Sequence, residues 1–202
     1  MTSRTRAVVL VLVVVLCLVL TEQIARGLGI ERAVGLLSLA SLATLVIGIK
    51  LGWRQGLLGV GSLALLTIPA ALSQGDPAAG TVVMTLTALA LGLSARWQLQ
   101  PVYWLIVVSL CLLITNSPLA ATATTADLAK LVLGVLASGS LTTLLLSKLL
   151  PRPDGAGTPA AFAVAHSWRR ALAYGSLLAV TTLITTPIAL QHHWHINGLW
   201  LI

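Results

Sequence analysis

Few residues in this 202-residue chain have side chains suited to chemistry, and the densest group is a set of histidines near the C-terminus, His192, His193 and His195. Histidines at this spacing can ligate a metal ion or titrate close to neutral pH. No carboxylate or cysteine lies beside them, so the sequence supplies too few ligands for a tetrahedral metal site. Three interpretations stay open: interfacial histidines without a special task, a substrate or proton role, and a metal site.

Charged side chains avoid the centres of the apolar runs, since Lys50, Arg96, Lys130 and Lys148 all lie at or near the end of a run. An ionisable group inside a span is the usual mark of an ion pathway. The sequence also lacks a glycine-rich phosphate loop, HExxH, GxSxG and a carboxylate pair. We therefore expect no enzymatic activity, no cofactor, no bound metal and no proton relay in this chain.

The elements that carry these residues are apolar runs. Hydrophobic residues make up 57% of the chain and charged residues 8%, against about 25% charged in soluble domains. This composition predicts an all-α, polytopic transmembrane helix bundle. Seven runs can be marked, at residues 7–20, 33–49, 56–72, 78–95, 101–115, 131–147 and 171–190.

The charges between the runs predict the orientation. If the N-terminus is cytoplasmic, nine of the twelve Lys and Arg residues lie inside with one acid, Asp154, and the other four acids lie outside. This bias is how short loops encode topology. The net charge of +7 is spread one or two residues per loop, so we expect contact with anionic lipid and no nucleic-acid partner. The inside residues are Arg4, Arg6, Lys50, Arg54, Arg96, Lys148, Arg152, Arg169 and Arg170.

The first run is only 14 residues long and follows Arg4 and Arg6, a pattern that a secretory signal also shows. No small-x-small cleavage site follows it. We expect an uncleaved first span whose helix continues through Ile24 and Ala25.

Small and hydroxylated residues mark two spans. Thr181, Thr182, Thr185 and Thr186 precede Pro187 in the seventh run. Their hydroxyls could bond to a carbonyl that the proline frees, or they could line a cavity. A second set allows close approach between helices: Gly52, Gly56, Gly59, Gly61, Gly134, Ser138 and Gly139.

The domain organisation is predicted as a first six-span half over residues 1–150, a cytoplasmic linker over 151–168, and the start of a second half over 169–202. The linker is rich in proline and glycine. The second half would comprise span seven and a truncated span eight. Arg6-Ala7-Val8 and Arg170-Ala171-Leu172 open spans one and seven in a similar way, which favours a parallel repeat. A longer match, 32–45 against 170–183, pairs an outward-starting helix with an inward-starting one and would indicate an inverted repeat. We prefer the parallel alignment because both of its members share one orientation.

Two segments carry a family resemblance. His166-Ser167-Trp168-Arg169-Arg170-Ala171-Leu172 opens one span, and His195-Ile196-Asn197-Gly198-Leu199-Trp200 opens the next. With Gly-Trp-Arg-Gln-Gly at 52–56, this arrangement resembles the fusaric acid resistance family, bacterial inner-membrane proteins related to aromatic acid exporters. Many members carry a large cytoplasmic domain between two six-span halves, whereas the connection here is short and the second half is nearly absent.

The resemblance implies efflux of small organic acids, chiefly aromatic carboxylates, across the bacterial inner membrane. It also implies Arg170, His195 and Trp200 as substrate-binding residues. The partners would be the lipid bilayer, a small organic anion, and a second copy or a missing second half. The alternative is a non-transporting membrane scaffold or assembly subunit, and a third interpretation is a membrane-embedded enzyme that uses the histidines.

The predicted topology has a direct test. Cysteines introduced at Gln74 and Ala126 should react with an impermeant thiol reagent added to intact cells, because both positions lie in outer loops. A cysteine at Gly155 should stay unlabelled. Labelling at Gly155 in intact cells would show that the orientation is wrong.

Overall fold

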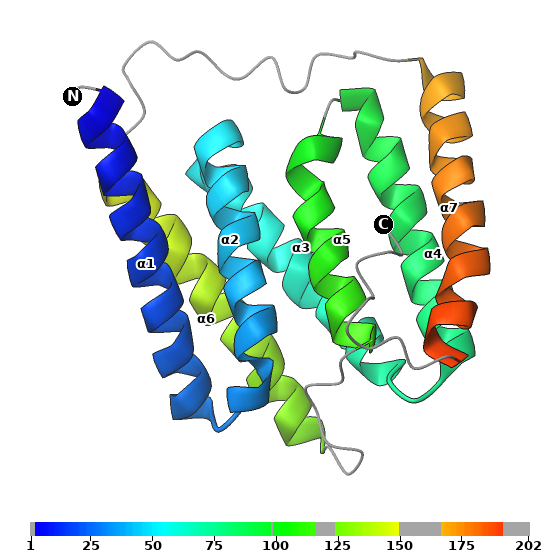
Figure 1. Cartoon of the computed structure of the whole chain (residues 1–202), viewed down its shortest axis with the longest axis horizontal. Helices are drawn as coiled ribbons and strands as arrows, with labels where there is room; N and C mark the ends of the chain where they lie inside the picture. The colour runs from blue at the N-terminus through cyan, green and yellow to red at the C-terminus, as the bar shows by residue number, and fades with distance from the viewer. Residues whose placement is uncertain (1–2, 98, 116–123, 150–166, 192–202) are drawn as a thin grey trace. The chain divides into compact units, whose positions relative to one another are not determined.

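The computed structural model describes residues 3–97, 99–115, 124–149 and 167–191, and this part of the chain forms helices joined by turns, without a strand (Figure 1). Each of the seven apolar runs coincides with one α-helix, apart from Ala33 and Ala95, which lie in the short turns η1 and η2. The all-α prediction is therefore confirmed. The elements are α1 (Ser3–Leu28), η1 (Glu31–Ala33), α2 (Val34–Leu51), α3 (Trp53–Leu72), α4 (Pro77–Ser94), η2 (Ala95–Trp97), α5 (Gln100–Thr115), α6 (Thr125–Leu149) and α7 (Trp168–Gln191).

Six stretches of the described chain are long and apolar enough to cross a membrane, as expected for a multi-pass membrane protein. The spans fall in every helix except α5, whose apolar part, Tyr103–Ile114, is shorter. The first helix continues through Ile24 and Ala25 to Leu28, as predicted. The orientation of the N-terminus and the internal repeat stay predictions.

The ends of the helices follow from local chemistry. Asp76 caps α4: its carboxylate accepts hydrogen bonds from the backbone N–H groups of Ala78 (2.9 Å) and Ala79 (3.2 Å), and Pro77 occupies the first helical position. At the start of α6, the side chain of Asp127 accepts from the N–H and the hydroxyl of Thr124, both at 2.9 Å. Gly52 joins α2 to α3 with φ of 101°, a conformation that side chains rarely adopt.

The described helices form two compact units. The first comprises residues 1–64 and 124–159 and contains α1, α2, α6 and the start of α3. Helix α6 packs against α1 and α2. Its glycines permit the contact with α2: a Cβ on Gly134 would lie 3.2 Å from a side-chain carbon of Leu37, and one on Gly139 would lie 3.3 Å from a side-chain carbon of Thr44. The hydroxyls of Thr21 and Ser41 share a hydrogen bond of 2.9 Å between α1 and α2.

The second unit comprises residues 65–123 and 160–202, and its main contact joins α4 to α7 (Figure 1). These helices are antiparallel: Gly80 near the start of α4 faces Leu190 at the end of α7, and Gly92 near the end of α4 faces Gly175 in the first half of α7. A Cβ on Gly92 would lie 2.8 Å from the backbone nitrogen of Gly175. The two backbones therefore touch, which only glycine permits.

Substitution of Gly92 tests this crossing. Gly92→Ala should force α4 and α7 apart and destabilise the protein by about 1–3 kcal/mol, the usual cost of overpacking. The measurement is the apparent melting temperature of the detergent-purified protein, followed by circular dichroism.

The matched control is Gly61→Ala in α3, because a Cβ on Gly61 meets nothing within 4 Å. This variant should melt at or slightly above the wild-type temperature, since alanine is the better helix former. Equal melting temperatures of the two variants would show that the contact of Gly92 with Gly175 does not stabilise the protein.

Candidate functional site

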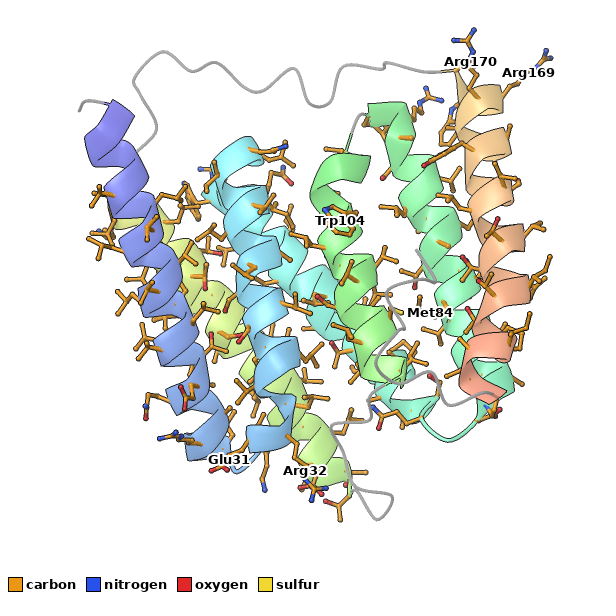
Figure 2. All side chains as sticks on the ribbon, in the orientation of Figure 1. Glu31, Arg32, Met84, Trp104, Arg169 and Arg170 are labelled. Carbon is orange, nitrogen blue, oxygen red and sulfur yellow. The ribbon has the colours of Figure 1, made fainter. Side chains whose placement is uncertain are left out.

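Of the three substrate-binding residues that the sequence predicts, the structure describes one. Arg170 lies in the first turn of α7, is exposed, and extends away from the helix beside Arg169 (Figure 2). Its backbone N–H is 3.4 Å from the hydroxyl of Ser167, which precedes the helix. His195 and Trp200 lie outside the described residues, so their position relative to Arg170 stays a prediction.

An arginine in contact with two tryptophans forms the most distinctive cluster at this end of the α4–α7 pair. The guanidinium carbon of Arg96 lies 4.1 Å from the ring centroid of Trp168 and 5.7 Å from that of Trp97. The two rings meet edge to face, with centroids 5.8 Å apart and planes at 84°. Cation–π contacts of this kind stabilise by about 0.5–2 kcal/mol each, more as water is excluded.

The antiparallel packing of α4 and α7 brings this cluster together. Arg96 and Trp97 form the short η2 turn directly after α4, and Trp168 is the first residue of α7. The contact of Gly92 with Gly175 holds the two helices close along this stretch. The sequence shows Arg96 beside Trp97 and Trp168 beside Arg169, which predicts two separate anchors at a membrane boundary. It does not show that one arginine contacts both rings.

The guanidinium of Arg96 is only partly satisfied. Its Nε and Nη1 atoms are buried and have no hydrogen-bond partner among the residues that the structure describes. Arg54 provides the contrast within the same chain. It lies 5.5 Å from the ring of the neighbouring Trp53, yet both side chains are exposed, so water can satisfy its N–H groups. A buried cationic donor without an acceptor is costly.

Two threonine hydroxyls, that of Thr85 in α4 and that of Thr186 in α7, are also buried without a described partner. Thr186 lies one turn before Leu190, whose side chain contacts Gly80 of α4, and its own exposure is 0%. Thr85 lies one turn before Leu89, which contacts Gly175 of α7. Both hydroxyls therefore belong to the faces that the two helices present to each other.

The other threonines of α7 do not play the predicted role toward Pro187. That proline frees the carbonyl four residues earlier, at Leu183. Three hydroxyls instead donate to carbonyls of the preceding turn: Thr181 to Leu177, Thr182 to Leu178, and Thr185 to Thr181, over 2.7–2.9 Å. Each of these three hydroxyls thus bonds to the backbone of the preceding turn of its own helix, whereas the hydroxyl of Thr186 has no described partner.

The described residues contain no group of three or more His, Cys, Asp or Glu side chains placed to hold a metal ion. The histidine cluster at 192–195 lies outside them. Comparison of the chain with protein-family models, curated proteins and solved structures found no match.

The unpartnered hydroxyl of Thr186 predicts an unusual mutational result. Thr186→Val removes a buried polar atom that makes no hydrogen bond in the described structure and keeps the shape of the side chain. The free energy of unfolding should therefore stay the same or rise. Thr182→Val, four residues earlier on the same helix, removes a hydrogen bond and should destabilise by about 0.5–1 kcal/mol.

The measurement is the apparent melting temperature of the two purified variants, determined under the same conditions. If Thr186→Val melts below Thr182→Val, the Thr186 hydroxyl has a structural partner and is not available to a ligand.

Proposed function

We propose that this chain belongs to an integral membrane transporter of the bacterial inner membrane that exports small organic acids, chiefly aromatic carboxylates. Six helices long and apolar enough to cross a membrane support the membrane setting. The resemblance of the segments around Arg170 and Trp200 to the fusaric acid resistance family supports the substrate class.

The observation that carries transport is the pair of buried, unpartnered hydroxyls between α4 and α7. In a bundle of apolar helices, a polar group gains stability only by finding a hydrogen-bond partner. The hydroxyls of Thr85 and Thr186 have no hydrogen-bond partner in the described structure. A substrate carboxylate or hydroxyl passing along this face would supply the missing partner, whereas a purely structural helix pair has no reason to keep both groups.

Charge supports the choice of an anion. Arg169 and Arg170 are exposed at the start of α7, with Arg96 close to the same helix end. Under the predicted topology this end faces the cytoplasm, so an organic anion leaving the cell would meet these arginines first. An arginine binds a carboxylate through its planar fork, which lysine reproduces only in part. His195 and Trp200 would act at the opposite boundary, where histidine can titrate and tryptophan can stack.

The proposed transporter consists of a six-span half over residues 1–150, a linker over 151–168 and the start of a second half over 169–202. Substrate sites in repeat transporters lie between the repeats, near the membrane midplane. A second copy of the chain or a further half would complete such a site.

The alternative is a membrane scaffold or assembly subunit that transports nothing. One observation favours it: α1 exposes an unbroken stripe of aliphatic side chains suited to lipid or to another helix. Its members are Val8, Val11, Leu12, Val15, Leu16, Leu18 and Val19. The two functions differ in whether the chain changes the distribution of a small acid across the membrane.

Transport is tested by loading cells with benzoate. Cells that produce the full-length protein should keep a lower internal benzoate concentration and grow at a higher external one than cells without it. Arg170→Ala should abolish this protection, and Arg170→Lys should retain part of it. Thr186→Val should reduce export without reducing the amount of protein in the membrane.

The matched control is Arg32→Ala, which removes an arginine that the predicted topology places outside. It should export as wild type does. Equal protection by wild type and Arg170→Ala, at equal protein levels, would remove Arg170 from the site. No protection by the wild type against any aromatic acid would leave the scaffold as the function.

A further inference from the structure

We propose that Arg96, Trp97 and Trp168 form a binding site for an oxyanion, a carboxylate or a phosphate, carried by a molecule with an apolar portion. This inference goes beyond transport, because such a site would hold its ligand whether or not the chain moves that ligand across the membrane.

A guanidinium has two kinds of surface. Its flat faces interact with aromatic rings, and its N–H groups point outward in its own plane. The ring centroid of Trp168 lies 4.1 Å from the guanidinium carbon, so the ring covers the cation with an aromatic surface. The ring does not accept hydrogen bonds from the N–H groups that point outward in the plane of the guanidinium. The buried Nε and Nη1 of Arg96 therefore still need oxygen acceptors, and none of the described residues provides one.

Three of the four described acids are engaged elsewhere, and none of the four accepts a hydrogen bond from the buried Nε or Nη1 of Arg96. Glu22 pairs with Arg26 and Asp127 with Lys130, while Asp76 caps α4. Arg169, which directly follows Trp168 in the sequence, has the same sign of charge as Arg96. The start of α7 adds backbone N–H groups and the positive end of a 24-residue helix dipole. An external anion is thus the partner that the electrostatics of this end favour.

The tryptophans specify the rest of the ligand. The Trp97 and Trp168 rings meet at a right angle, and the Trp168 side chain is half exposed. An acyl chain or an aromatic ring attached to the oxyanion could pack against the exposed ring surface. Two sources share this chemistry: the phosphate of an anionic lipid at the membrane surface, and an aromatic carboxylate in solution.

The experiment measures binding to the full chain purified in detergent, through its tryptophan fluorescence. One arm titrates dioctanoyl phosphatidylglycerol, with dioctanoylglycerol as the same lipid without phosphate. The other titrates sodium benzoate, with benzyl alcohol as the uncharged analogue. A saturable change for an anion, at least about tenfold tighter than for its uncharged analogue, is expected from charge-assisted hydrogen bonds. The arm that saturates identifies the source.

Variants assign the binding to Arg96. Arg96→Gln should weaken it by about tenfold or more, and Arg96→Lys, which keeps the charge, should give an intermediate affinity. Arg54→Gln is the matched control, since it removes an arginine beside a tryptophan at an exposed position, and it should bind as wild type does. All tryptophans stay in place, so the signals are comparable.

Binding by Arg96→Gln with wild-type affinity would overturn the proposal, as would a wild type that binds neither anion better than its analogue. If Arg96→Gln does not fold, the wild type and Arg96→Lys still test the proposal. The wild type must bind the anion more tightly than its uncharged analogue, and Arg96→Lys must bind the anion less tightly than the wild type does. Transport of benzoate is measured separately, so loss of the site and loss of the transport function give different results.

Discussion

Lipid tails are as apolar as leucine, so helices in a membrane gain little by burying aliphatic side chains against one another. Their association depends on close backbone approach and on hydrogen bonds, and both units of this chain follow that constraint. Gly139 of α6 lies against Val60, and Gly92 of α4 meets Gly175 of α7. The hydrogen bond between Thr21 and Ser41 is the polar counterpart of these contacts.

The same constraint explains which parts of the structure the sequence predicts. Apolar runs bounded by charges indicate a helix wherever they occur, because an unpaired backbone cannot lie in hydrocarbon. Seven such runs correspond to seven α-helices. These features depend on neighbours in sequence, so one chain suffices to find them.

Pairing of distant helices was not predictable in this way. Gly56, Gly59, Gly134 and Gly139 lie close to side chains of other helices as expected, but Gly61 faces open space. The contact between Gly92 and Gly175, the tightest of the described glycine contacts, was not predicted because isolated glycines in apolar runs are common. The contact of Arg96 with Trp168 follows from that crossing, so it was missed for the same reason. Of the predicted site, only Arg170 falls in the described residues.

The order of packing partners has a consequence for how the chain is made. Helices α1 and α2 pack with α6, and α4 packs with α7, although α3 to α5 are synthesised between α2 and α6, and α5 and α6 between α4 and α7. A ribosome delivers helices to the membrane one after another. The packing faces of the early helices therefore stay uncovered by their partners until the later helices emerge. The packing of each unit is therefore completed only when its last helix, α6 in the first unit and α7 in the second, has left the insertion machinery.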